Sequence, residues 1–276
     1  MPWIWTALMP HPPVMIAAVG RGRENEAALT LAGAARIQSR LGLLPRGGQP
    51  DLLLVLSPHQ PYAPGVFFLN DAGQMSGGLE GFGAPQVHFE LKSPSAARRD
   101  LRAHLKRRGL PLISTPVARL GPDHGTLVPL HFLAEIFENQ PPVILANPVG
   151  LSPAEALELG RALADFKPAG RWALLASGDL SHRLRLEGPG GFHPSGEKFD
   201  RELVAAVADG QVNSLLENWP ARRLQEAGEC GFRSALTMLG LMSGLGHDHG
   251  AELLSYEGPF GVGYANAFKL LGDPEL

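Results

Sequence analysis

Cysteine and charge are scarce in this 276-residue sequence, and each shortage excludes a class of protein. A single cysteine, Cys230, leaves no partner for an internal disulfide. Charged residues make up 18% of the chain and the net charge is −3. Basic residues gather only around residues 98–108, which fits the solvated face of a helix, so we expect no nucleic-acid binding.

Long hydrophobic runs are also missing. No stretch reaches the roughly 20 apolar residues that a membrane span needs. Residues 1–13 lack the basic start of a secretory signal. We therefore expect a cytoplasmic protein that does not enter a membrane.

Glycine and proline, by contrast, are abundant, with 34 and 25 residues, and they predict many tight loops. The hydrophobic fraction of 44% is that of a globular protein with a large core. No internal repeat or linker divides the chain, so we expect one domain over residues 1–276.

Short apolar segments alternate with longer helical patterns along the chain. The clearest strands are predicted at residues 3–9, 51–56, 142–146 and 172–176, with closing strands near 255–256 and 263–271. Helices are predicted at residues 24–41, 95–108, 127–137, 198–209 and 233–243, and another opens at Ser152. Residues 65–69 and 87–91 read as a hairpin-like pair, and 112–115 as a short strand. This alternation predicts an α/β domain with a largely parallel central sheet flanked by helices.

Histidines follow several of these predicted strands. His11, His59 and His182 each come just after one, and His124 precedes a predicted helix. The carboxyl ends of parallel strands form a crevice where ligands bind, so these side chains are expected to meet there. Each histidine taken alone could instead cap a loop or fill the core. Together they predict a pocket that holds a divalent metal.

A carboxylate and a thiol, Glu229 and Cys230, stand side by side where the helix at residues 233–243 begins. Both are metal-ligand types. Glu229 could instead be a charge that favours a helix N-terminus, and Cys230 could be a small buried residue. The residues alone leave the choice of third ligand open.

Five motifs in this order resemble the catalytic subunit of the class III extradiol ring-cleaving dioxygenases. They are MPHPP, SPH, DHG followed by TLVPL, SGDLSH, and the acidic segment at Glu229. A closer likeness is to the MEMO-like proteins of the AmmeMemoRadiSam group, through GPGG with FHPSG, GECGFRS and the tail YEGPFGVGY. The resemblance covers nearly the whole chain.

The resemblance implies roles for individual residues. His11, His59 and one of Glu229 or Cys230 would hold the metal. The residue before the glycine is a carboxylate in the dioxygenases and a cysteine in MEMO-like proteins, which favours Cys230, whereas Fe(II) oxygen chemistry favours the harder Glu229. His182 would be the acid/base residue and His124 a second pocket histidine. Fe(II) is the expected ion, with zinc and copper as alternatives.

The leading functional hypothesis is a metal-dependent oxygenase-like enzyme that opens catecholic rings, with a small aromatic substrate and O₂ as its partners. The alternative is a MEMO-like protein that keeps the metal pocket but works in an AmmeMemoRadiSam partner system without ring cleavage. A zinc hydrolase using the same pocket is a third reading. The chain is also a candidate homo-oligomer.

Overall fold

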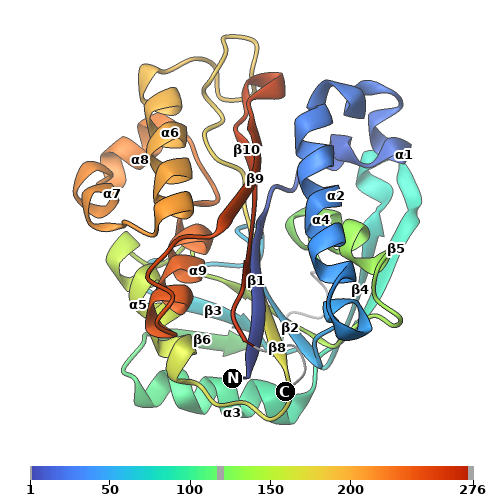
Figure 1. Ribbon diagram of the computed structural model, residues 1–276, viewed down its shortest axis with the longest axis vertical. Coiled ribbons are helices and arrows are strands. Elements are labelled where there is room, and N and C mark those ends of the chain that lie inside the picture. Colours follow the sequence, from blue (N-terminus) through green and yellow to red (C-terminus); the bar gives the residue numbers. More distant parts are fainter. Residues whose placement is uncertain (1, 117–120, 273–276) are drawn as a thin grey trace.

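An eight-stranded sheet runs through the middle of the molecule (Figure 1). The computed structural model describes residues 2–116 and 121–272. Four neighbouring strands at the centre, β7, β2, β8 and β1, run parallel. Listed across the sheet, the strands are β6 (Leu112–Thr115), β3 (Phe67–Asn70), β7 (Val143–Asn147), β2 (Leu52–Leu56), β8 (Trp172–Ser177), β1 (Trp3–Met9), β10 (Tyr264–Leu270) and β9 (Glu252–Glu257). The predicted α/β fold with a largely parallel central sheet is confirmed.

Helices cover both faces of this sheet (Figure 1). Helices α2 (Ala28–Gly42) and α4 (His124–Ala134) pack on one face, and α5 (Pro153–Asp165), α6 (Pro194–Asp209) and α9 (Phe232–Gly244) pack on the other. Strand β2 shows why both faces are covered, because it is apolar at every position. Leu53 and Val55 point to the α2 side, while Leu54 and Leu56 point to the α5 side.

The remaining helices are short or peripheral. They are α1 (Ala17–Gly20), α3 (Ser95–Arg107), α7 (Asn213–Asn218) and α8 (Ala221–Ala227). The sequence did not predict α1, α7 and α8, which are too short to show a clear helical period. None of the helices within the described part of the chain is long and apolar enough to cross a bilayer.

Helices α5 and α9 pack backbone against backbone. A Cβ built on Gly160 would lie 2.1 Å from the carbonyl oxygen of Thr237, and one built on Gly240 would lie 2.1 Å from that of Leu157. Ser152 caps α5 as predicted, in a capping box with Glu155. This close packing holds α9 (Phe232–Gly244) against α5, and Cys230 lies two residues before α9 begins.

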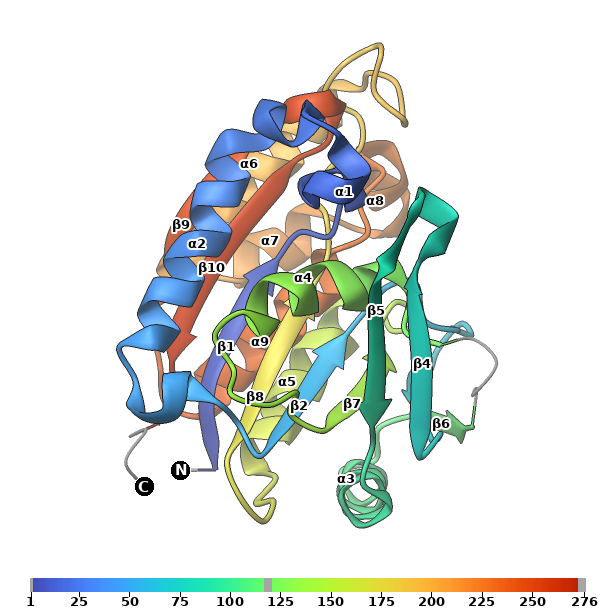
Figure 2. The same ribbon diagram turned by 90° about the vertical axis from the view of Figure 1, so that its right-hand side faces the viewer.

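One predicted pairing is wrong. Residues 65–69 and 87–91 do not form a hairpin, because β3 lies in the main sheet between β6 and β7. Strand β5 (Ala84–Lys92) instead pairs with β4 (Gln74–Leu79) in a separate two-stranded sheet, seen at the side of the molecule in Figure 2. The sequence concealed β4 because Gly77 and Gly78 weaken its strand signal.

Three helix starts also differ from the prediction, and one of them is that of the helix predicted at residues 198–209, which begins at Pro194. The helix predicted at residues 24–41 begins at Ala28, after a 3-10 turn over Arg23–Ala27. The helix predicted at 127–137 begins at His124, because the Asp123 side chain accepts a hydrogen bond from the Thr126 backbone N–H at 3.1 Å and caps it. His124 therefore stands on the first turn of α4 rather than in a loop.

Candidate metal centre

The predicted histidines lie where the parallel strands end. His11 follows β1, His59 follows β2, and His182 follows β8, and these three strands are neighbours in the sheet. The loops after them therefore open at the same edge, as expected for an α/β sheet.

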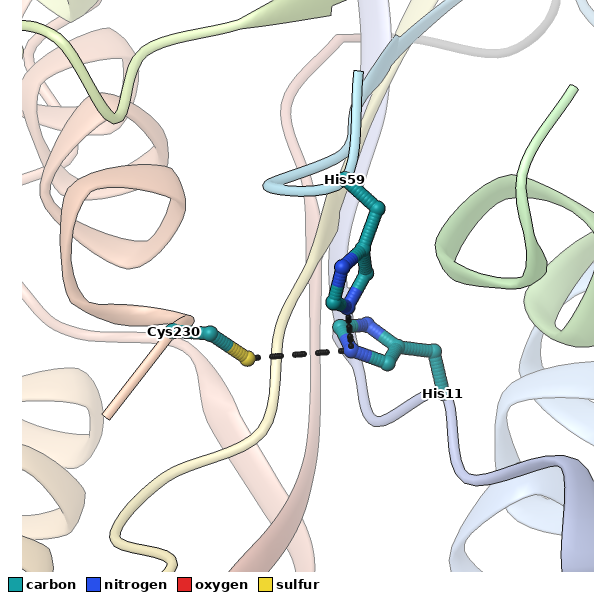
Figure 3. Close-up of side chains that lie close together, drawn as sticks. All are labelled: His11, His59 and Cys230. Carbon is teal, nitrogen blue, oxygen red and sulfur yellow. Dashed lines mark hydrogen bonds between the residues drawn. The ribbon is translucent and has the colours of Figure 1, made fainter. Parts of the chain in front are cut away.

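Three side chains from distant parts of the sequence converge at this edge (Figure 3). The Nε2 atom of His11 lies 3.1 Å from Nε2 of His59 and 3.7 Å from Sγ of Cys230. The ligand atoms of these three residues all lie within 4.8 Å of one another. His11 is buried, Cys230 is half-buried and His59 is exposed, so the cluster is closed on one side and open on the other.

The tautomer of His11 is fixed by its surroundings. The Ser177 hydroxyl donates to the carbonyl oxygen of Gly125, so its oxygen accepts from Nδ1 of His11 at 2.9 Å. The Nδ1 atom therefore carries the proton, and the Nε2 lone pair faces His59 and Cys230. A hydrogen bond of this kind is what orients metal-binding imidazoles in proteins.

Glu229 faces away from this cluster. Its carboxylate accepts from the backbone N–H of Phe232 at 2.7 Å and pairs with the Arg233 guanidinium at 3.2 Å. Glu229 thus supplies a hydrogen-bond acceptor to the first turn of α9. Burial raises the pKa of its carboxyl, and the Arg233 guanidinium opposes that effect. Of the two adjacent candidates, the structure turns Cys230 toward His11.

Asp179 and His182 approach Cys230 from the loop after β8. Their ligand atoms and Sγ of Cys230 form a second group within 4.8 Å of one another. The backbone N–H of Asp179 donates to Sγ at 3.3 Å. His182 donates from Nδ1 to the carbonyl oxygen of Gly228 at 2.6 Å, so its Nε2 is free, and that atom lies 3.9 Å from Oδ2 of Asp179.

His124 stacks beside the cluster rather than within it. Its ring centroid lies 4.1 Å from that of His59 and 5.4 Å from that of His11. Asp123, the residue before His124, accepts from the Ser57 hydroxyl at 2.6 Å and from the Gln60 side chain. Asp123 therefore ties the His59 loop to the start of α4.

A cleft of about 780 Å³ opens beside His59. Its lining comes from the loop at residues 58–62, from residues 76–78 and 80 at β4, and from residues 121–123. Tyr62 stands at its rim with 63% of its surface exposed. The cleft gives a small molecule access to the exposed side of the histidine cluster.

Burial sets the charge of the pocket. It lowers the pKa of His11 well below the ordinary value, helped by the neighbouring imidazoles, and it lowers the pKa of His124. Burial and the negative charge of Asp179 raise the pKa of the Cys230 thiol well above the ordinary value. Neutral imidazoles are the form that binds a metal, and a metal ion bound beside Cys230 would favour the ionised form of its thiol.

Comparison with known proteins places this pocket in a family. The family model for the catalytic LigB subunit of aromatic ring-opening dioxygenase matches residues 5–267. The chain belongs to this family. The resemblance to ring-cleaving dioxygenases that the motifs suggested is thereby confirmed, while the closer likeness to MEMO-like proteins stays a prediction.

Two similar proteins extend this result for the LigB-family chain. Protein CA_C1420 of Clostridium acetobutylicum is 32% identical over 268 residues, which cover 93% of this chain and 55% of the relative. The chain thus spans about half the length of that protein. The crystal structure of the uncharacterized protein JW3007 from Escherichia coli K12 shares the fold, with a TM-score of 0.62 at 18% identity, over 96% of this chain and 99% of that one.

The donor set of this LigB-family pocket fits a metal ion. Tetrahedral bonds of about 2.05 Å to nitrogen and 2.3 Å to sulfur separate two nitrogens by about 3.3 Å and a nitrogen from a sulfur by about 3.6 Å. The corresponding separations here are 3.1 Å and 3.7 Å. Little side-chain movement is needed for an ion to enter.

Sequence reasoning missed two features of this site. It assigned no role to Ser177, although a hydroxyl at the last residue of a buried strand that leads to His182 was a usable signal. It also missed the wall formed by β4, for which the doublet Gly77-Gly78 carried no recognisable pattern.

Proposed function

We propose that this LigB-family protein is a metal-dependent enzyme of the ring-opening dioxygenase type, acting on a small catecholic aromatic with O₂. The observation that carries the proposal is the convergence of His11, His59 and Cys230, of which His59 also lines a cleft of about 780 Å³, large enough for such a ring. Iron(II) bound by these three residues would supply the redox and Lewis-acid chemistry that ring opening requires. Zinc and copper are the alternatives for a site with one thiolate.

His182 is the proposed acid/base residue. Its Nδ1 proton is committed to the Gly228 carbonyl oxygen, so Nε2 is free to take a proton from a substrate hydroxyl and to return it later. Asp179, whose Oδ2 lies 3.9 Å from that Nε2, would stabilise the protonated ring. With Asp179 beside it, His182 would hold a proton at Nε2 during the reaction.

His124 is proposed to orient the substrate. It lies on the first turn of α4, tilted by 38° against the His59 ring, with Phe82 at 5.5 Å. Burial lowers its pKa, so the ring stays neutral and can both donate and accept a hydrogen bond. The Phe82 and His124 rings together would limit how an aromatic substrate lies in the cleft.

The decisive test combines metal analysis with oxygen uptake. Protein purified without oxygen and loaded with iron(II) is mixed with a panel of catechols, and O₂ consumption and the absorbance of the opened ring are followed together. We expect one O₂ per ring opened. His182→Gln should keep its iron and lose turnover by about 100-fold or more, the usual size of an acid/base contribution. A wild-type protein that binds iron but consumes no O₂ with any catechol would refute ring cleavage.

The second candidate is a partner-system protein that keeps the metal pocket without ring cleavage. Cys230, rather than Glu229, stands beside His11, and the Clostridium relative carries nearly half its length outside the matched region. The separately expressed remaining part of that relative should then bind this chain in size-exclusion chromatography. Size-exclusion chromatography of this chain alone gives its mass in solution and so tests for a homo-oligomer.

A further inference from the structure

Asp200 is a buried carboxylate outside the proposed centre. It lies on α6, its surface is 0% exposed, and neither the metal cluster nor the cleft includes it. Its Oδ1 accepts from the backbone N–H of Ser181 at 2.7 Å, and its Oδ2 accepts from the Tyr256 hydroxyl at 2.8 Å. A buried carboxylate is costly, so these contacts call for an explanation.

Ser181, the residue that Asp200 holds, joins the two loops of the centre. Its hydroxyl donates to the carbonyl oxygen of Ala227 at 2.7 Å, next to the turn that leads to Cys230. Its carbonyl oxygen accepts from the backbone N–H of Gly263 at 2.8 Å, just before β10. His182, the next residue, binds the carbonyl oxygen of Gly228 through both its backbone and its ring. A shift of Ser181 would therefore move both His182 and the Cys230 turn.

The room for this carboxylate depends on a glycine. A Cβ built on Gly263 would lie 1.9 Å from Oδ2 of Asp200, so a larger residue there would collide with the side chain. The carboxylate thus occupies a space shaped by the Ser181 loop, Gly263 and Tyr256.

We propose that Asp200 is a positioning residue, which fixes the loop carrying Asp179 and His182 against the Cys230 turn through its hydrogen bond to Ser181. The bond gives the buried Ser181 N–H its acceptor, and a buried N–H without one is costly. Asp200 touches neither metal nor substrate and acts through the loop alone. The inference rests on the proposed function only where it concerns metal binding.

The test compares three variants by two measurements that need no turnover. Asp200→Ala removes the acceptor, Asp200→Asn keeps an oxygen for Ser181, and Glu202→Ala is the matched control. Glu202 lies on the same helix and accepts from the buried Trp219 indole at 2.7 Å, and its described partners, Lys198, Asn218 and Trp219, belong to neither loop. The measurements are the alkylation rate of Cys230 in metal-free protein and the affinity and thiolate charge-transfer band of bound cobalt(II).

For Asp200→Ala, Cys230 alkylation should rise about tenfold and cobalt affinity should fall about 10- to 100-fold, the range seen when residues behind metal ligands are changed. The cobalt band should also shift. Asp200→Asn should restore the alkylation rate and the cobalt affinity to within about threefold of wild type. Glu202→Ala should leave both quantities at the wild-type level.

The proposal is overturned if Asp200→Ala matches wild type, if Glu202→Ala produces the same changes, or if Asn fails to rescue. Should Asp200→Ala not fold, Ser181→Ala replaces it, because that change removes the hydroxyl's bond to the Ala227 carbonyl oxygen together with the bond that the hydroxyl accepts from the Arg183 N–H. It must then raise Cys230 alkylation, and an unchanged rate refutes the proposal. Failure of wild type to bind cobalt would count against the proposed function, while the alkylation result would still decide the role of Asp200.

Discussion

The two sides of the candidate centre are built differently. On the β8 and α9 side, the loop at Asp179 and the turn at Cys230 are joined by backbone hydrogen bonds, including Gly231 N–H to the Asp179 carbonyl oxygen at 2.8 Å. On the β2 and α4 side, His59 is exposed and faces the cleft of about 780 Å³. We call these the closed side and the open side.

This difference indicates that the two sides serve different functions, one in metal binding and the other in substrate binding. The closed side holds two acids, the buried Asp179 and the half-buried Cys230, whose pKa values are raised by burial, so it is suited to a cation. The open side offers ring faces and space, which suits an aromatic ligand. Changes on the closed side should therefore affect metal and stability, and changes on the open side, other than at the ligand His59, should affect substrate alone.

The largest effect is expected from the thiol of the closed side. Cys230→Ala should lower metal affinity by more than about 100-fold, because a ligand is lost and not merely its support. Glu229→Gln should change the affinity by less than about threefold, since its side chain can still accept from the Phe232 N–H. Isothermal titration with zinc and cobalt(II) measures both. If Glu229→Gln loses the metal and Cys230→Ala keeps it, the orientation of this pair is wrong.

The next effect concerns how tightly the closed side is packed. A Cβ on Gly178 would lie 2.1 Å from Cα of Gly231, so Gly178→Ala must push the two loops apart. We expect a loss of about 2–3 kcal/mol in the free energy of unfolding, measured with denaturant. Gly81→Ala on the open side has nothing within 4 Å of its Cβ and serves as the control, with a change within about 0.5 kcal/mol. Equal losses in both variants would remove the distinction between the sides.

The same contrast explains how much the sequence could predict. His11, His59 and His182 were expected to meet because each follows a strand, and strand ends converge by the geometry of a parallel sheet. The choice between Glu229 and Cys230 could not be made, since it depends on side-chain direction at a helix start. The β4–β5 wall of the open side was missed because its pairing is tertiary and Gly77 and Gly78 hide the strand.

Buried polar groups on both sides of the centre were equally hidden. Asp200 lies within a helical pattern in which an acidic residue normally faces solvent, and nothing local marks it as buried. Ser57 and Gln60, whose side chains bind Asp123, read only as loop residues in the sequence. Their partners come from distant segments, so only the folded chain reveals them.

A smaller effect should appear in the pH dependence of stability. Burial raises the pKa of Asp200 to about 7 from an ordinary value of 3.8, and its titratable contact is Tyr256 of β9. A carboxyl whose folded pKa is raised favours the native state at low pH and loses that contribution as pH rises through the folded pKa. Relative to Asp200→Asn, wild type should lose about 1.4 kcal/mol of unfolding free energy between pH 6 and pH 8.

That measurement uses urea unfolding of both proteins at several pH values. Groups that titrate alike in both proteins cancel in the difference, so the slope reports Asp200. A difference that stays flat across this range would show that Asp200 does not take up a proton on folding near neutral pH. The burial of the Asp200 carboxyl would then need another explanation.

The smallest effect is expected at the rim of the open side. Tyr62 lines the cleft with 63% of its surface exposed, and no described hydrogen bond ties its side chain to the closed side. Tyr62→Ala should leave metal affinity and stability unchanged and raise the KM for a catechol about two- to tenfold with kcat unaltered, the size of one aromatic contact. Tyr62→Phe keeps the ring and should behave as wild type. Because the ring contacts substrate before and during reaction alike, its loss should weaken binding uniformly. A fall in kcat, or a loss of metal, would instead mean that the open side helps to hold the centre at positions other than His59, and the division between the two sides would not stand.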